Sequence, residues 1–169
     1  MARYQATVQS SRSPAETFAY LATFSNAVEW DPGVLASEQL DPGPVGPGTR
    51  FCLVVPFLGR RVTLIYRVTS YQPGQEVVLT ATSGLLRATD KIAVTGDAAG
   101  SAVSYEAEVR LRGPLGILDP LLRPGFRAVA VRAAAGLAQA LSPGPGAGTS
   151  ESLGTVSSGR TAPPRREAP

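Results

Sequence analysis

Six short segments in which apolar and polar residues alternate follow one another in the middle of the sequence, and they constrain the fold more than any other feature. They span residues 34–40, 49–56, 61–71, 76–82, 86–95 and 102–112. The connections between them read DPGPVGPG, LGR, QPGQ, SG and GDAAG. Connections rich in Gly, Pro and Asp are typical of hairpin turns. This succession predicts six consecutive strands of an antiparallel sheet.

The last of these segments shows the alternation most clearly. One face carries Val103, Tyr105, Ala107, Val109 and Leu111, and the other carries Ser104, Glu106, Glu108, Arg110 and Arg112. A strand with one apolar and one polar face has one side in the core and one in water. The pattern therefore predicts a sheet that is covered on one face only.

A strand and two short helices are expected before the six segments. Residues 4–9 alternate as a strand. In SRSPAETFAYLATFSN, Ser13 is expected to cap a helix, with Pro14 in its first position, Glu16 completing a capping box, and a buried stripe of Phe18, Leu21 and Ala22. Asn26 followed by Glu29 repeats the capping signal and predicts a second helix, which Pro32-Gly33 ends.

A long helix is expected after the strands, following the segment GPLG at 113–116. Phe126, Ala130, Ala133 and Leu137 share one face of it, and Arg132 and Gln139 lie opposite. The apolar face is rich in alanine, so it is expected to pack close to a sheet at some points and to leave space at others. The resulting order is strand, two short helices, six strands and a long helix.

The composition changes abruptly at Ser142. Residues 142–169 contain fifteen Gly, Pro or Ser residues among 28 and almost no apolar side chains. Such a segment cannot bury enough surface to offset the entropy of ordering it. We therefore expect one domain over residues 1–141, followed by a disordered tail over 142–169.

The sequence contains no histidine, which excludes a Ser-His-Asp or Cys-His active site and a histidine-ligated metal or haem. Its single cysteine, Cys52, excludes an intramolecular disulfide and a multi-cysteine zinc site. We therefore expect no metal and no cofactor. The net charge of +3 comes from basic residues scattered along the sequence, so no nucleic-acid partner is expected.

No stretch of the sequence is apolar enough to predict a transmembrane segment. The most apolar stretch, 115–141, is interrupted by charged residues and prolines, and MARYQATVQS lacks the apolar core of a signal peptide. We therefore expect a cytoplasmic protein. The leucines of GPLGILDPLLRPGF (113–126) leave open a gate, a peripheral contact with a membrane or partner, and a loop packed on the sheet. Nothing in the sequence indicates the oligomeric state.

This order of elements, together with the local sequence, resembles the START-like (SRPBCC) superfamily of polyketide cyclase/dehydrase-type proteins. The resemblance lies in SPAETFAYLATFSNAVEWDPGV, GTRFCLVVPFLGRRVTLIYRVTSYQPGQEVVL, GSAVSYEAEVRLRG and the final helix. It implies an α+β helix-grip fold, in which a curved seven-stranded antiparallel sheet surrounds a long C-terminal helix. It also implies a hydrophobic small-molecule ligand between sheet and helix. A minority of the family are enzymes, such as aromatic polyketide cyclases, and others move lipids or quinones or act as stress co-factors.

Strand alternation predicts the side chains that face the interior, and the resemblance implies that they line a ligand cavity rather than fill a solid core. The strands supply Phe51, Leu53, Val55, Leu64, Tyr66, Val68, Leu79, Asp90, Ile92, Tyr105, Ala107 and Val109. The final helix supplies Arg123, Phe126, Ala130, Ala133 and Leu137. Trp30, at the end of the second short helix, is expected over one end of the cavity, as a structural lid, a ligand contact or both.

Asp90 is the polar exception in this set. In LRATDKIAV the alternation that turns Ile92 inward also turns Asp90 inward, and a buried carboxylate needs a partner or a proton. Tyr66 and Tyr105 are candidates to supply hydroxyls, and Arg123 a charge. In one interpretation Asp90 is a base or ligand anchor, with Tyr66 as the second candidate catalytic residue. In the other, Asp90 lies at a wet strand end or pairs with an arginine for structure.

Three functions remain open at this point. The first is a carrier of an apolar molecule such as a lipid, a quinone or a polyketide-like compound. The second is a cyclase or dehydratase that uses Asp90 and Tyr66 as acid–base groups. The third is a module that regulates a partner through its sheet face or tail. An apolar cavity without a paired carboxylate favours the first, a buried Asp90 within hydrogen-bond reach of a tyrosine favours the second, and a filled interior favours the third.

Overall fold

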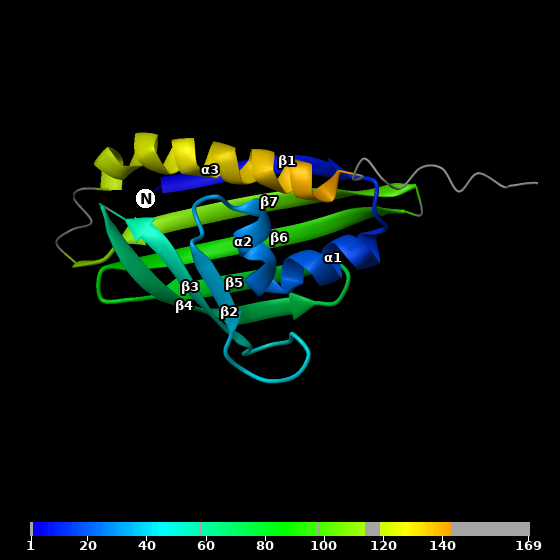
Figure 1. Ribbon diagram of the computed structural model, residues 1–169, viewed down its shortest axis with the longest axis horizontal. Coiled ribbons are helices and arrows are strands. Elements are labelled where there is room, and N and C mark those ends of the chain that lie inside the picture. Colours follow the sequence, from blue (N-terminus) through cyan, green and yellow to red (C-terminus); the bar gives the residue numbers. More distant parts are fainter. Residues whose placement is uncertain (1, 58, 98, 114–118, 143–169) are drawn as a thin grey trace, which may run out of the picture.

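A seven-stranded antiparallel sheet with the order β1-β7-β6-β5-β4-β3-β2 forms the framework of the computed structural model (Figure 1). The structure describes residues 2–57, 59–97, 99–113 and 119–142, and for residues 119–124 and 126 it describes the backbone alone. The strands are β1 (Ala2–Ser10), β2 (Ala36–Gln39), β3 (Arg50–Phe57), β4 (Arg60–Gln72), β5 (Glu76–Thr82), β6 (Leu86–Asp97) and β7 (Gly100–Leu111). The helices are α1 (Pro14–Ala22), the 3₁₀ turn η1 (Phe24–Asn26), α2 (Ala27–Trp30) and α3 (Asp119–Leu141).

All the helices lie on one face of the curved sheet (Figure 1). The long helix α3 runs beside β1, while α1 lies over β6 and β7. The chain thus has the α+β helix-grip architecture that the sequence predicts. Among the described residues, no helix is long and apolar enough to cross a membrane.

The start of α1 follows the predicted capping box. The Ser13 hydroxyl accepts a hydrogen bond from the backbone N–H of Glu16, and a Glu16 carboxylate oxygen accepts one from the Ser13 backbone N–H at 3.1 Å. These bonds satisfy two N–H groups that the first turn leaves without helical partners. Phe18, Leu21 and Ala22 are buried as predicted, and they fix α1 on the sheet.

The second capping prediction is wrong in its detail. Asn26 makes no capping bond with its side chain and has helical backbone angles, because it is the last residue of η1. Its Nδ2 instead donates to the backbone oxygen of Tyr20 at 2.9 Å, and Glu29 accepts a hydrogen bond from the Tyr20 hydroxyl at 2.7 Å. Both residues therefore attach α2 to α1 rather than cap α2.

The strands agree with the predicted segments to within about two residues, which is the usual uncertainty of element ends. β5 has the predicted bounds. β2 begins later than predicted because the Val34 N–H donates to the Asp31 oxygen at 2.9 Å, which makes residues 31–34 a turn. β6 and β7 extend into the predicted loop, and glycine at position 96 allows this close pairing. Its φ is 136°, and a Cβ at this position would lie 2.3 Å from the Gly100 oxygen.

The final helix lies where it is expected, after GPLG, whereas the expectation of a loop over residues 113–126 is wrong in its second half. α3 starts at Asp119, so the second half of the segment 113–126, expected to be a loop, is helical, while residues 114–118 lie outside the described residues. Pro120 is the second residue of α3 and loses no helical hydrogen bond there, since the first four N–H groups of a helix have no partner within it.

The C-terminal end of α3 is fixed by the loop after β1. The Ser10 hydroxyl donates to the Leu141 oxygen at 3.4 Å, and Arg12 Nη2 donates to the Ala140 oxygen at 3.1 Å. A cation near the last carbonyl groups of a helix is also favourable for the helix dipole. These contacts hold α3 along β1, where its apolar face is directed at the sheet.

Candidate functional site

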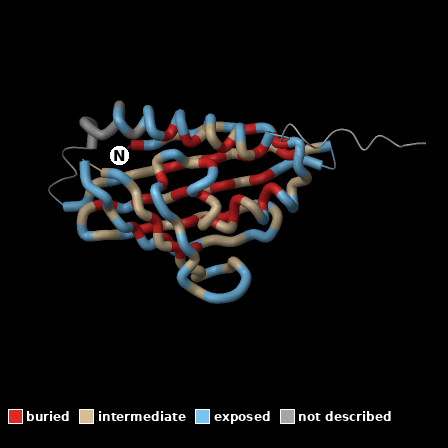
Figure 2. Tube along the Cα trace, in the orientation of Figure 1, coloured by how far each residue is buried: buried red, intermediate tan, exposed pale blue. Residues whose placement is uncertain are grey.

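Most of the predicted inward strand residues are buried on the face of the sheet that the helices cover, and buried positions alternate along the strands (Figure 2). Val55 and Val109 are only partly buried. The fully buried strand residues of the predicted set are Phe51, Leu53, Leu64, Tyr66, Val68, Leu79, Asp90, Ile92, Tyr105 and Ala107. The alternation therefore identified the covered face of the sheet without an error of parity.

The predicted stripe of α3 also faces the sheet. Ala130, Ala133 and Leu137 are each at most 4% exposed, whereas Arg132 and Gln139 are exposed on the other side. Arg123 and Phe126 belong to α3, but their side chains lie outside the described residues. The proposed charge from Arg123 at the site therefore remains a prediction.

Asp90 lies in the middle of β6 with its carboxylate in the interior. The residue is 6% exposed, and its Oδ1 accepts a hydrogen bond of 2.7 Å from the Tyr105 hydroxyl. Tyr66, from β4, supplies a second hydroxyl that interacts with the same carboxylate. The interpretation of Asp90 as a wet strand-end residue is therefore wrong, and among the described residues its partners are tyrosines rather than an arginine.

The interior changes the protonation of these groups. Burial raises the pKa of Asp90 to about 6, although the hydrogen bonds from Tyr105 and Tyr66 partly oppose the effect. Burial also raises the pKa of Tyr66 and of Tyr105 well above 10, and the nearby Asp90 charge adds to both increases. Near neutral pH the tyrosines thus remain hydrogen-bond donors, while Asp90 can accept or release a proton.

Aromatic rings surround this carboxylate. Trp30, which is 2% exposed, packs edge-on against Tyr105 with 5.6 Å between ring centroids. Phe24 lies at the centre of the group, 5.3 Å from Tyr66, 6.1 Å from Phe51 and 6.3 Å from Trp30. Trp30 therefore covers the tyrosine that holds Asp90, and its expected place over one end of a cavity remains a prediction.

α3 closes over the same region. A Cβ at Gly136 would lie 2.1 Å from the Trp30 carbonyl oxygen, so only glycine allows this approach of α3 to α2. Nearer the start of α3, the Val129 side chain lies close to Gly33. A Cβ at Gly33 would lie 3.0 Å from Val129 Cγ1. The segment 30–33 is thus held between α3 and the sheet.

Asp31 is a site residue that the sequence analysis missed. Its Oδ1 accepts a hydrogen bond of 2.7 Å from the Gly33 N–H, and partial burial raises its pKa, while Arg132 on α3 acts in the opposite direction. The Asp31 charge is close enough to raise the pKa of Asp90, Tyr66 and Tyr105. Its place directly after Trp30 was the available signal, but WDPG was interpreted as a helix end.

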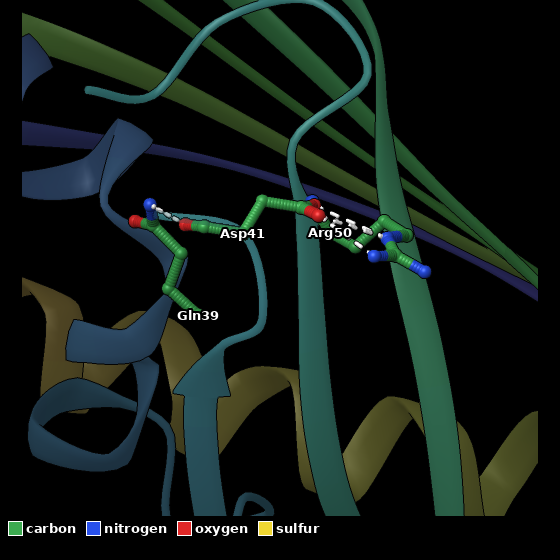
Figure 3. Close-up of polar contacts among 3 residues, drawn as sticks. All are labelled: Gln39, Asp41 and Arg50. Carbon is green, nitrogen blue, oxygen red and sulfur yellow. Dashed lines mark hydrogen bonds and ion pairs between the residues drawn. The ribbon is translucent and has the colours of Figure 1, made fainter. Parts of the chain in front are cut away.

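A second polar cluster has a different role. At the connection between β2 and β3, Asp41 accepts hydrogen bonds of 2.7 Å from the backbone N–H and from Nη2 of Arg50, and its backbone oxygen accepts one from Gln39 Nε2 (Figure 3). The Arg50 guanidinium lowers the pKa of Asp41. These contacts hold the loop between β2 and β3, so we assign this partly exposed cluster a structural role.

The comparisons with known proteins agree with this geometry. The family model described as "Polyketide cyclase / dehydrase and lipid transport" matches residues 1–142. No curated protein matches the sequence. Solved structures of the START/SRPBCC superfamily, including aromatase/cyclase proteins, have the same fold.

Three of these structures illustrate the similarity. A START superfamily protein from Mycobacterium smegmatis has a TM-score of 0.67 at 12% identity, over 83% of this chain and 97% of that one. The protein TTHA0849 from Thermus thermophilus has a TM-score of 0.65 at 14% identity, over 83% and 95%. The Zhui aromatase/cyclase from Streptomyces sp. R1128 has a TM-score of 0.64 at 16% identity, over 82% and 90%. Because this family model matches residues 1–142, the chain belongs to the polyketide cyclase / dehydrase and lipid transport family.

Proposed function

We propose that the chain binds an apolar small molecule bearing a hydrogen-bonding oxygen, between the covered face of the sheet and α3. The observation that carries this proposal is the buried Asp90–Tyr105 pair within an otherwise apolar set of side chains. Burial of a carboxylate is unfavourable unless it has partners. A carboxylate that stands among aliphatic and aromatic residues is suited to anchor the polar end of a ligand.

The family supports the apolar part of this proposal, since its description includes both polyketide cyclisation and lipid transport. The inward set provides aromatic surface from Phe51, Tyr66 and Trp30, and small side chains from Ala130 and Ala133. Pockets for small molecules commonly combine such apolar walls with a few polar groups that orient the ligand. Asp90, Tyr66 and Tyr105 would be the orienting groups.

A second function is favoured by the protonation of Asp90. A carboxyl group with a pKa of about 6 that is held by a tyrosine hydroxyl is suited to general acid–base catalysis near neutral pH. In an aldol cyclisation of a poly-β-ketone, Asp90 would take a proton from a methylene group as the new C–C bond forms. A tyrosine would donate its proton to the ketone oxygen that becomes a hydroxyl and would regain a proton from the protonated Asp90. In the dehydration, Asp90 would remove the remaining methylene proton and return it to that hydroxyl, which leaves as water as the C=C bond forms.

Native mass spectrometry of the purified protein tests the binding function. We expect a co-purifying small molecule, or a one-to-one complex with 2-naphthol as a bicyclic apolar probe. Loss of that complex in Ala133→Phe, with the fold retained, would place the molecule between α3 and the sheet. A protein that is free of any small molecule and does not bind the probe would contradict the proposal.

The second function requires a separate assay. An apolar β-diketone such as 1-(2-naphthyl)butane-1,3-dione should interconvert faster between its keto and enol forms when the protein is present, as followed by the absorbance of the enol. In the catalytic case Asp90→Asn should reduce this acceleration by about 100-fold or more while retaining affinity. Affinity that changes without any acceleration by the wild-type protein would leave the binding function alone.

A further inference from the structure

We propose that the interior selects its ligand by charge, so that it accepts a neutral or cationic apolar molecule and rejects one whose polar end is an anion. This inference rests on the proposed binding function and adds the chemical class of the ligand. It separates polyketide-like phenols, alcohols, ketones and amines, which the site would bind, from fatty acids and other carboxylates, which it would exclude.

The inference starts from the acidic and neutral groups that face the interior. Asp90 from β6, Tyr105 from β7 and Tyr66 from β4 form one interacting group, and Asp31, at the end of α2, acts electrostatically on all three. Two carboxyl groups and two hydroxyls give this region a negative charge whenever Asp90 is ionised. A ligand hydroxyl or ammonium can donate to Asp90, and a ligand carbonyl can accept from a tyrosine.

Among the described residues, the cations lie outside the interior, and Arg132 offsets part of the Asp31 charge. Among the side chains that the structure describes, no lysine or arginine is buried. Lys91, next to Asp90, points to the opposite face of the sheet and forms an ion pair of 2.8 Å with Glu76. Arg132 faces Asp31 from the exposed side of α3.

An anionic ligand would therefore meet a carboxylate that is paired with tyrosines and with no cation among the described side chains. Like charges interact strongly in a low-dielectric interior, where little water is present to screen them. The ligand anion would also lose its own hydration on entry. Protonation of Asp90 or release of the ligand to water would relieve this repulsion. The affinity for an anion should therefore depend on whether the Asp90 carboxyl is protonated.

Three probes that share one apolar ring system test the inference: 2-naphthol, 2-naphthalenesulfonate and 2-naphthylmethylamine. Their affinities for the full chain are measured by calorimetry between pH 5 and 8, a range in which the sulfonate stays anionic, the amine stays cationic and the naphthol stays neutral. The chain has no histidine, and burial raises the pKa of Asp90 to about 6, so among the described side chains we expect Asp90 to titrate in this range.

At pH 8 we expect the naphthol and the amine to bind and the sulfonate to bind at least about tenfold more weakly, the equivalent of one pKa unit of charge repulsion. Towards pH 5 the affinity for the sulfonate should rise and that for the amine should fall. Asp90→Asn should remove most of both trends. Glu38→Gln, which changes an acid on β2 away from the site, is the matched control and should leave them unchanged.

The outcomes separate this inference from the function on which it rests. Equal affinity of the wild-type protein for naphthol and sulfonate at pH 8, with both bound in the interior, would overturn charge selection and leave the binding function intact. A pH trend that persists in Asp90→Asn would overturn the role of Asp90. If no probe binds, the proposed binding function fails and the inference fails with it. Should Asp90→Asn not fold, the opposite pH trends of sulfonate and amine in the wild-type protein decide the question.

Discussion

The Tyr105 hydroxyl reaches Asp90 diagonally across the β6–β7 pair, at 2.7 Å from Oδ1. Asp90 is paired in register with Ala107, and Tyr105 is paired with Ile92. Diagonal neighbours in antiparallel strands are within reach of long side chains. The small side chain of Ala107 leaves room beside Asp90, so the tyrosine can lean along the strand and place its hydroxyl on the carboxylate.

This geometry predicts how stability depends on pH. The pKa of Asp90 is about 6 in the folded protein and near its ordinary value of 3.8 in the unfolded chain. The folded state therefore binds the proton more tightly, and its stability falls as pH rises between these two values. We expect a loss on the order of 2–3 kcal/mol from pH 4 to pH 7 that Asp90→Asn lacks. Urea denaturation of the wild-type protein and of Asp90→Asn at several pH values measures this loss. Parallel pH profiles of stability for the two proteins would contradict the prediction.

Removal of the tyrosine hydroxyls should change the pKa of Asp90. Tyr105→Phe and Tyr66→Phe each remove a hydrogen bond that lowers the pKa of Asp90, so each should raise that pKa further. The lost partner should also reduce stability at pH 7 by about 1–3 kcal/mol. NMR titration of the Asp90 carboxyl and chemical denaturation measure the two effects. Tyr4→Phe, at a half-buried position of β1, is the control, and an Asp90 pKa equal in all three variants would refute the prediction.

Added bulk on α3 should remove ligand binding. Ala133 is 2% exposed and faces the sheet, whereas Ala135, on the same helix, is exposed. Ala133→Phe should abolish fluorescence of a bound apolar probe if the interior holds space for it, and Ala135→Phe should not. Unchanged affinity in Ala133→Phe, with a fold destabilised by about 1–3 kcal/mol, would mean that the interior is a solid core.

Two glycines of α3 should respond to alanine in opposite directions. A methyl group at Gly136 would lie 2.1 Å from the Trp30 oxygen, whereas one at Gly125 has no heavy atom within 4 Å. Gly136→Ala should destabilise the protein by about 1–3 kcal/mol and weaken probe binding, because α3 must move away from α2. Gly125→Ala should stabilise it by about 0.5–1 kcal/mol, the usual gain at an exposed helical site. Thermal denaturation that ranks the two variants equally would exclude this contact.

Removal of residues 143–169 should leave the domain intact. The family model ends at residue 142 and α3 ends at Leu141, and the composition of the removed segment provides no apolar face for docking. We expect a change in stability within about 0.5 kcal/mol, as for surface changes in general. A large fall in melting temperature on truncation would place the domain boundary further along the chain.

The sequence by itself determined the strands, their polarity and the identity of the inward residues. Alternation along a strand has a period of two, so it can be recognised without knowledge of any partner. It placed Asp90, Tyr66 and Tyr105 on the same face as Phe51 and the other buried residues, and the structure confirms that placement. The capping box of Ser13 and Glu16 is equally local, and it is present.

The tertiary structure alone decided which of these side chains meet. The pairing of Asp90 with Tyr105 depends on the register of β6 against β7, and the position of Asp31 near them depends on how α3 and α2 pack. Asn26 failed as a cap because η1 continues through it, and residues 119–126 are helical although a loop was also expected there. Local patterns fix the face on which a residue lies, whereas contacts between residues far apart in the chain arise only when the elements pack together.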